Sequence, residues 1–365
     1  MDKHLYQYWF MRNEDITYSR KHKLIDYFYD SYNIYFATKK DLVDSGLMDD
    51  KTADTFILNR GKFDLSKEYE EFSHSPFSFI TMEDVAYPDK LRNIYDKPYG
   101  LYYVGQIPSF ERAVSIVGAR RCSAYGKRLA LQIGDKLGQN GYTVISGMAR
   151  GIDAYGHKGC IDAGGKTIAV LGSGCDVIYP ADNRILYEEI LSTGGAIISE
   201  YQMGTSPVAM NFPRRNRIVS ALSDIVVVIE AREKSGSLIT ADFALEQGKD
   251  IYVTPGRIGD SLSSGTNKLI AQGAGIIYDI DQFIADIQNF YGLKPEKINA
   301  EKKPKIILTE EQKKVYKLFD DYPKSISTVI EESGMDYLNL LSVVLSLERL
   351  ELLSEVFKNN YVKTA

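Results

Sequence analysis

Short apolar runs separated by helix-length segments recur through the middle of the chain. The runs lie at 113–117, 142–145, 167–171, 196–198, 225–229, 251–253 and 275–277. They are apolar on both faces, which is typical of strands in a parallel sheet that helices cover on both sides. The pattern predicts an α/β domain over residues 76–290, with an extended Rossmann-like, mostly parallel sheet. Right-handed crossovers would bring the loops after these strands to one edge of the sheet, where such folds bind ligands.

Different patterns flank this domain. Residues 1–75 carry Tyr and Phe at helical spacing and end before Pro76, which predicts a small helical domain. Residues 291–305 are charged and bracketed by prolines, as in a linker. Residues 306–365 contain three helical stretches and the pattern of a hairpin, which predicts a winged-helix-like domain. We expect these helices to be capped by Thr309 with Gln312, by Ser327 and by Asp336.

Composition limits the class of protein. The 365 residues are 44% hydrophobic and 25% charged, as in globular proteins of two or three domains. No apolar run approaches the roughly 20 residues that cross a bilayer, and the first residues lack a secretory pattern, so we expect no membrane partner. The three cysteines and four histidines are scattered without metal-ligand or disulfide spacing. We therefore expect a cytoplasmic protein without a metal or another cofactor.

The net charge of −5 does not by itself favour nucleic acid. Local clustering matters more, because fields of exposed charges decay over about 10 Å at moderate salt. The C-terminal domain has seven basic and ten acidic residues, and its third helix carries only Glu348 and Arg349 near its end. A helix that reads a DNA groove needs several Arg, Lys, Asn or Gln side chains. We therefore expect this domain to contact protein.

Glycine-bearing turns follow three of the predicted strands, over 118–123, 146–153 and 172–176, and the first contains Arg120 and Arg121. Glycine lets backbone amides approach a ligand, and helix amino termini favour anions, so these turns predict a phosphate-binding edge; purely structural turns are the alternative. No turn spells Gly-x-Gly-x-x-Gly or ends in Gly-Lys-Ser/Thr, which removes the main support for a dinucleotide oxidoreductase or an ATPase. We expect Asp153 to cap a helix rather than to act as a general base.

The segment 211–222 combines arginines with a helical pattern that starts near Pro213. Its buried face is predicted to consist of Ile218, Val219 and Leu222. Arg214 and Arg217 lie three apart on a side away from that face, so we expect both to bind phosphates. Arg215 falls along the buried stripe of the helix. Ligand binding and a structural ion pair are equally good interpretations of its role. Phe212 could stack on a base or form a hydrophobic staple.

A cluster of small polar residues, Ser235-Gly236-Ser237 with Thr240, follows the strand at 225–229. Ser237 is the expected N-cap of the next helix, and Ser235 and Thr240 would place hydroxyls beside free amides. Capping alone explains Ser237 but not the whole cluster.

Several long motifs resemble the bacterial DNA-processing protein A family, DprA or Smf. They include SIVGARRCSAYG (115–126), SGMARGIDAYGHKGCIDAGGKTIAVLGSGCDVIYP (146–180), NFPRRNRIVSALSD (211–224) and EAREKSGSLITADFALEQGKDIYVTPG (230–256). The resemblance implies a non-catalytic protein that binds single-stranded DNA, protects incoming DNA during natural transformation and helps load the RecA recombinase for homologous recombination. It also implies a homodimer formed through the Rossmann-like domain, and an N-terminal domain similar to a sterile alpha motif.

The family's DNA pocket corresponds here to Arg120, Phe212, Arg214, Asn216, Arg217, Ser235, Gly236 and Ser237. Together with the residues found from the turns and the helix, the expected DNA contacts also include Arg121, Arg215 and Thr240. Two other functions stay open. One is an enzyme of a related Rossmann-like fold that hydrolyses nucleoside monophosphates, although Ser-Gly-Ser replaces the Pro-Gly-Gly-x-Gly-Thr loop of such enzymes. The other is a scaffold that binds a protein partner through its acidic terminal domains.

Overall fold

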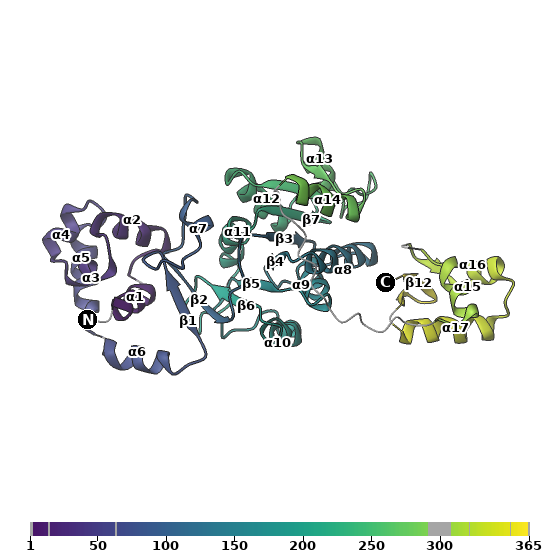
Figure 1. The fold of residues 1–365 in the computed structure, drawn as a ribbon, viewed down its shortest axis with the longest axis horizontal. Helices are drawn as coiled ribbons and strands as arrows, with labels where there is room; N and C mark the ends of the chain where they lie inside the picture. The colour runs from purple at the N-terminus through teal and green to yellow at the C-terminus, as the bar shows by residue number, and fades with distance from the viewer. Residues whose placement is uncertain are drawn as a thin grey trace.

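The chain has three parts that follow one another along its length (Figure 1). The structure is a computed structural model that describes residues 3–13, 15–62, 64–290, 308–320, 322–350 and 352–363. N-terminal helices lie at one end, a large sheet with its helices lies in the middle, and a small C-terminal domain lies at the other end (Figure 1). The linker predicted at 291–305 lies outside the described residues. No helix in those described ranges is both long and apolar enough to span a membrane.

The central sheet has nine strands in the order β1-β2-β6-β5-β4-β3-β7-β8-β9. They are β1 (Ser78–Thr81), β2 (Gly100–Gly105), β3 (Ala113–Gly118), β4 (Thr143–Ser146), β5 (Thr167–Leu171), β6 (Ala196–Ser199), β7 (Ile225–Ile229), β8 (Asp250–Val253) and β9 (Gly275–Ile276). The strands β3 to β9 pair in parallel, which confirms the predicted sheet. The antiparallel strands β1 and β2, which extend the sheet beyond β6, were not predicted from the sequence.

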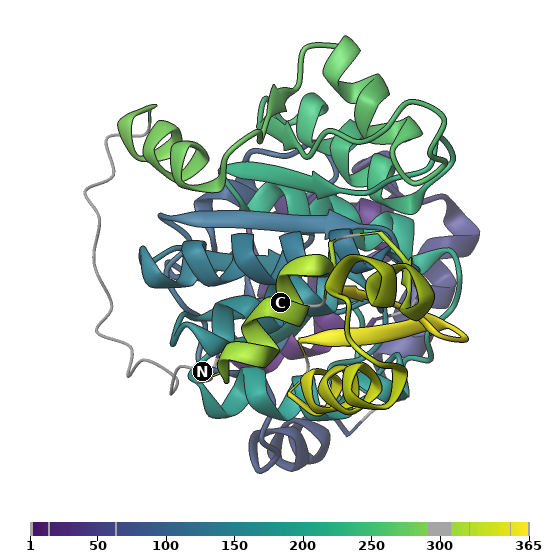
Figure 2. The ribbon, with the colours of Figure 1, turned by 90° about the vertical axis from the view of Figure 1, so that its right-hand side faces the viewer.

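Helices cover both faces of this sheet (Figure 2). One face carries α8 (Ala124–Gln139), α9 (Ile152–Asp162), α10 (Arg184–Ser192) and α14 (Ile280–Phe290); the other carries α7 (Asp89–Arg92), α11 (Asn211–Leu222), α12 (Gly236–Glu246) and α13 (Ser264–Ala271). The strand β3 shows why both faces are apolar. Ile116 packs in the core of α8 and α9, whereas Val117 packs in the core of α11 and α12. A strand buried on both sides needs a continuous apolar run, as the sequence has.

The helices α8 and α9 approach each other backbone to backbone. A Cβ at Gly159 would lie 2.2 Å from the Leu131 carbonyl oxygen, and one at Gly134 would lie 2.4 Å from the Gly156 carbonyl oxygen. Only glycine fits such contacts. This packing determines where α9 begins at the carboxyl edge of the sheet.

Six N-terminal helices pack around aromatic side chains. They are α1 (Lys3–Arg12), α2 (Tyr18–Phe28), α3 (Ser31–Phe36), α4 (Lys39–Asp44), α5 (Asp50–Arg60) and α6 (Leu65–Ser73). Trp9, Phe10 and Phe56 are buried in one cluster that continues into Tyr102 of β2 and Ile197 of β6. This shared cluster anchors the helical part directly on the antiparallel end of the sheet.

The C-terminal domain has a separate core of its own. It contains α15 (Glu310–Leu318), α16 (Ile326–Ser333), α17 (Tyr337–Arg349), and the strands β10 (Lys324–Ser325), β11 (Leu353–Phe357) and β12 (Asn360–Lys363). Three helices with a small antiparallel sheet match the predicted winged-helix-like arrangement. The capping box of Thr309 and the cap of Asp336 are present, but Ser327 was the wrong cap for α16. Ser325, one residue before that helix, accepts from the Thr328 amide.

The close contact of α8 and α9 gives a stability prediction. We expect Gly159→Ala to lower the free energy of unfolding by about 1–3 kcal/mol, because the added methyl overpacks a backbone contact. Denaturant unfolding would measure the change. Gly61→Ala is the matched control, since a Cβ there meets nothing within 4 Å and φ is −87°. Equal effects of the two substitutions would contradict this view of the helix pair.

Candidate functional site

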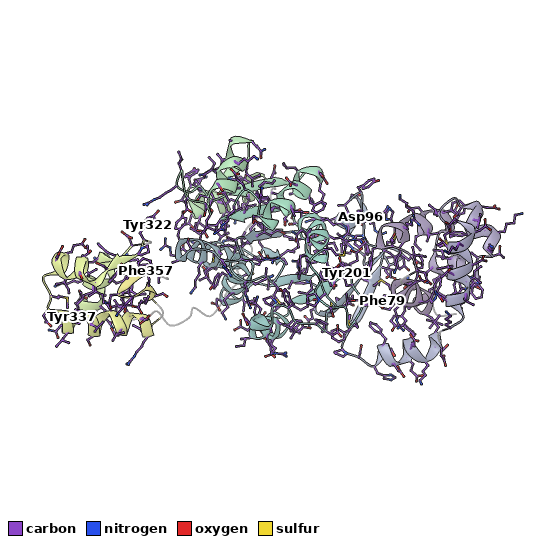
Figure 3. All side chains as sticks on the ribbon, turned by 180° about the vertical axis from the view of Figure 1, so that it is seen from behind. Phe79, Asp96, Tyr201, Tyr322, Tyr337 and Phe357 are labelled. Carbon is purple, nitrogen blue, oxygen red and sulfur yellow. The ribbon has the colours of Figure 1, made fainter. Side chains whose placement is uncertain are left out.

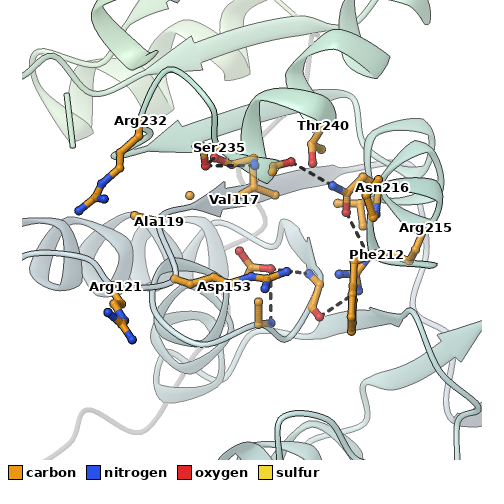
Figure 4. A pocket seen from close by; sticks show the side chains of 18 of the residues that line it. Val117, Ala119, Arg121, Asp153, Phe212, Arg215, Asn216, Arg232, Ser235 and Thr240 are labelled. Carbon is orange, nitrogen blue, oxygen red and sulfur yellow. Dashed lines mark hydrogen bonds between the residues drawn. The ribbon is translucent and has the colours of Figure 1, made fainter. Parts of the chain in front are cut away.

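A pocket of about 440 Å³ opens at the carboxyl ends of β3, β4 and β7 (Figure 4). This is the point at which the strand order reverses, between β3 and β7, where doubly wound sheets leave a crevice. Its walls come from the turns after β3 and β4, from α11 and from the segment 232–240. Arg121 and Arg232 lie on one side of the pocket, and Phe212, Asn216 and Thr240 lie on the other (Figure 4).

Positive charge dominates this pocket. Five basic residues and one acidic residue, Asp153, line it. Four of the basic side chains are exposed and form no ion pair with any residue in the described part of the chain: Arg120, Arg121, Arg232 and Lys234. The fifth, Arg215, is buried. Such a concave surface attracts anions over a distance of several ångströms.

Arg215 connects α11 to the ends of two strands beneath the pocket. Its side chain is 4% exposed, and its Nη1 donates to the carbonyl oxygens of Gly147, at 2.9 Å, and of Val170. Its Nε donates to Asn216 Oδ1 at 3.2 Å. Burial lowers the pKa of Arg215 to about 10, although the nearby Asp153 carboxylate favours the charged form. Of the two interpretations left open by the sequence, these contacts favour the structural one.

Asp153 holds the turn after β4 in place. Its Oδ2 accepts from the amides of Gly147 at 3.1 Å and Ala149 at 3.4 Å. The prediction that it caps α9 was wrong, because Gly151 is the N-cap and Asp153 lies inside the helix. Burial raises the pKa of Asp153, and the Arg215 charge opposes that rise. A Cβ at Gly147 would lie 2.5 Å from Arg215 Nη2, so this turn requires glycine.

A carboxylate of the chain already occupies the start of one helix near the pocket, α8. The Glu230 carboxylate accepts from the Ser123 amide at 2.8 Å, and also from the Ser123 hydroxyl, at the start of α8. At the start of α12, the Ser235 hydroxyl accepts a hydrogen bond from the Ser237 amide at 3.3 Å. Ser235, rather than the predicted Ser237, is thus the N-cap. The amino end of α12 has a hydroxyl rather than a carboxylate as its cap, so it is suited to an external anion.

Phe212 brings an aromatic ring into the pocket wall. The Arg120 guanidinium lies 5.5 Å from the ring centroid, and the Tyr179 ring lies 5.4 Å away at an angle of 32°. A Cβ at Gly172 would lie 2.9 Å from Phe212 Cδ1, so the glycine turn after β5 leaves room for this ring. The ring is half-buried and lines the pocket, as a ligand-facing residue would.

Arg214 and Arg217 do not reach the pocket. Arg217 is 3% exposed; its Nη2 donates to Glu200 Oε1 at 2.7 Å, and its Nε lies 3.2 Å from Asp96 Oδ2. The Arg214 guanidinium lies over the Tyr18 ring, 5.0 Å from its centroid, and within 4 Å of Glu200 and Asp96. The prediction that both arginines lie on an open side of the helix was wrong. Segments distant in sequence cover that side, where the N-terminal helices meet the sheet (Figure 3).

The structure brings nine of the eleven predicted site residues to the pocket: Arg120, Arg121, Phe212, Arg215, Asn216, Ser235, Gly236, Ser237 and Thr240. Sequence reasoning missed Arg232 and Lys234, although Lys234 immediately precedes Ser235 and Arg232 lies three residues before it. It also missed Tyr179 and Arg150, which line a smaller adjoining recess.

Within the described residues, no group of three or more His, Cys, Asp or Glu side chains could hold a metal ion.

Residues 78–288, more than half of the chain, match the sequence model of the DNA recombination-mediator protein A family. Among curated proteins, the chain is 39% identical over 242 residues to Protein Smf of Synechocystis, covering 65% of this chain and 61% of that protein. It is 39% identical over 225 residues to DNA processing protein DprA of Streptococcus pneumoniae, covering 61% of this chain and 77% of that protein. The aligned part therefore spans less than two thirds of the Synechocystis relative.

Two solved structures share the fold. DNA processing protein A of Streptococcus pneumoniae superposes with a TM-score of 0.67 and 32% identity, covering 77% of this chain and 97% of that chain. DNA processing protein A of Helicobacter pylori, described for its mode of binding single-stranded DNA, superposes with a TM-score of 0.54 and 31% identity. That match covers 60% of this chain and 99% of the other.

The buried ion pair on α11 gives a second stability prediction. Glu200→Gln removes the carboxylate charge that faces buried Arg217, so we expect a loss of about 3–5 kcal/mol in unfolding free energy. Guanidinium unfolding would measure it. Glu188→Gln, on the exposed side of α10, is the control and should change stability by no more than about 0.5 kcal/mol. A Glu200 variant as stable as the control would show that the pair contributes little.

The buried His157 should make the free energy of unfolding depend on pH. This histidine of α9 is fully buried beside Thr167 Oγ1, and burial followed by the Arg215 charge lowers its pKa from 6.5 to about 3. The unfolded chain binds more protons at His157 between these pH values, so stability should fall as the pH drops from about 6.5 toward 3. We expect His157→Asn to reduce that slope by up to about 1.4 kcal/mol per pH unit. The exposed His74→Asn control should keep the wild-type slope.

Proposed function

Because the chain belongs to the DNA recombination-mediator protein A family, we propose that it binds single-stranded DNA in the pocket at the carboxyl ends of β3, β4 and β7. One observation carries this proposal. Within the region that matches the family, four exposed cations without ion-pair partners in the described residues line the same pocket as an accessible aromatic ring. The Helicobacter pylori relative of the same fold, described for its binding of single-stranded DNA, supports it.

The pocket offers both kinds of contact that a single strand needs. Arg120, Arg121, Arg232 and Lys234 provide charges for backbone phosphates, and the amino end of α12 adds the positive end of a helix dipole. Phe212 provides a ring on which an unpaired base can stack. The bases of a duplex are already paired and stacked, so duplex DNA would use only the phosphate contacts. We therefore propose a preference for single strands.

We further propose that this binding is not coupled to cleavage of the strand. Asp153 is the one carboxylate lining the described pocket, and it accepts from two backbone amides. A carboxylate used in this way is poorly placed to serve as a general base. Release of a free base from a nucleoside monophosphate would instead favour the related hydrolases.

The cellular role follows from the family resemblance. We propose that the chain protects incoming DNA during natural transformation and helps load the RecA recombinase. A homodimer formed through the Rossmann-like domain rests on the same ground, whereas the proposed cytoplasmic location rests on the scattered cysteines. The DNA contacts proposed here leave out Arg214 and Arg217, because Glu200 and Asp96 neutralise them.

A binding experiment tests the proposed function. We expect fluorescence anisotropy to show tighter binding of labelled oligothymidylate than of a duplex of equal length. Arg120→Ala should weaken binding and make the salt slope shallower by about 0.7, the value for one lost phosphate contact. Phe212→Ala should cost about 1–3 kcal/mol and leave that slope nearly unchanged.

The control for this experiment is Arg349→Ala, which removes an exposed arginine of the C-terminal domain that does not line the pocket. It should bind as the wild type does. Single-strand affinity that is indifferent to both Arg120 and Phe212 would show that the strand binds elsewhere.

A further inference from the structure

We propose that Tyr179 and Arg150 form a second nucleotide subsite beside Phe212. A neighbouring base of the same strand would stack on the Tyr179 ring, and Arg150 would bind its phosphate. This proposal rests on the proposed single-strand binding and adds to it a defined path for the strand. It concerns two residues that do not line the larger pocket.

The subsite occupies a recess of about 160 Å³ that adjoins the larger pocket. Arg120, Arg121 and Phe212 line both cavities, so the two share one wall. Arg150 and Tyr179 line only the smaller one. A strand that leaves the larger pocket past Phe212 would meet these two side chains next.

The Tyr179 ring has a free surface for a base. It is 44% exposed, and its centroid lies 5.4 Å from that of Phe212 with the planes tilted by 32°. For a base to stack between the two rings, the ring planes would have to lie about 7 Å apart, twice the optimal carbon separation of about 3.5 Å. The rings therefore do not sandwich one base. Each ring offers a separate surface, and two consecutive bases can be bound side by side.

The backbone around Tyr179 is held in position without a ligand. Asn183 of the short helix η1 (Ala181–Asn183) donates from Nδ2 to the Met148 carbonyl oxygen at 2.8 Å. The Tyr187 hydroxyl donates to the Cys175 carbonyl oxygen at 2.9 Å. These bonds tie the segment that carries Tyr179 to the turn after β4 and to α10. A ring that is already positioned loses less conformational entropy on binding.

Arg150 is held by a carboxylate that a phosphate can replace. Its Nη2 lies 2.6 Å from Asp182 Oδ2, and the two side chains are 64% and 67% exposed. Exposed ion pairs are weak because water and salt screen them. A backbone phosphate offers the same charge and, like a carboxylate, two strong acceptor oxygens, so it can exchange with Asp182. The Arg217–Glu200 pair, at 3% and 2% exposure, has no such freedom.

Abasic scanning of the DNA tests the base-stacking part. An oligothymidylate with one abasic site, moved along the strand, would be titrated against the full-length wild type, Tyr179→Ala, Tyr179→Phe and Phe212→Ala. We expect Tyr179→Ala to lose about 5- to 100-fold in affinity, and Tyr179→Phe to bind normally because stacking needs only the ring. One abasic position should abolish the effect of Phe212→Ala, because the base that stacks on Phe212 is then missing. The affinity loss caused by Tyr179→Ala should disappear when the abasic site is moved to the neighbouring position. Thermal unfolding would establish that each variant is folded.

The abasic map separates the possible results. If Tyr179→Ala and Phe212→Ala lose their effects at the same position, Tyr179 only supports the Phe212 ring and the second subsite is wrong. Wild-type affinity of Tyr179→Ala would also overturn it, while leaving the proposed function intact. If the wild type fails to bind single strands at all, both proposals fail together.

A pair of variants tests the phosphate contact. Arg150→Ala should weaken binding and make the salt slope shallower by about 0.7. Asp182→Asn, which removes the competing carboxylate, should strengthen binding at low salt. Equal affinity of both variants and the wild type would overturn the role of Arg150.

Discussion

The buried guanidinium of Arg215 is the contact on which the pocket depends. It joins α11 to the carbonyl oxygens of Gly147 after β4 and Val170 in β5, elements that are separate in sequence. The nearby Asp153 carboxylate favours its charged form and also holds the β4 turn, which needs glycine at 147 to leave room for both side chains. A buried charge with these partners is costly to disturb, so it makes α11 rigid. Phe212 and Asn216, on the same helix, are thereby held facing the pocket.

Four arginines in or near the pocket form two pairs with different physical roles. Arg215 and Arg217 are almost completely buried and bind carbonyl or carboxylate oxygens, so their charges are already compensated. Arg120 and Arg121 are exposed at the pocket and have no ion-pair partner in the part of the chain that the structure describes. Only the second group retains an uncompensated charge for a polyanion. A chain with net charge −5 can therefore present a basic binding surface.

The sequence predicted what depends on local pattern and missed what depends on distant contacts. The parallel strands β3 to β9 were found because strands buried on both faces are continuous apolar runs. The strand β2 was missed because residues 106–112, which separate it from β3, are too few for a crossover helix, so it lies outside the alternation of strands and helices that located the others. The glycine turns located the pocket, since strand ends and their turns are neighbours in sequence. The partners of Arg217, Asp96 and Glu200, lie far from it in the chain, so a helical wheel could not show that this arginine is buried.

The most direct test of this account is a crystal structure of the protein with bound oligothymidylate. The account predicts backbone phosphates beside Arg120 and the amino end of α12, with a base on the Phe212 ring, and an Arg215 guanidinium that still donates to Gly147 and Val170. A strand that lies instead over Arg214 and Arg217, or only on the terminal domains, would contradict it.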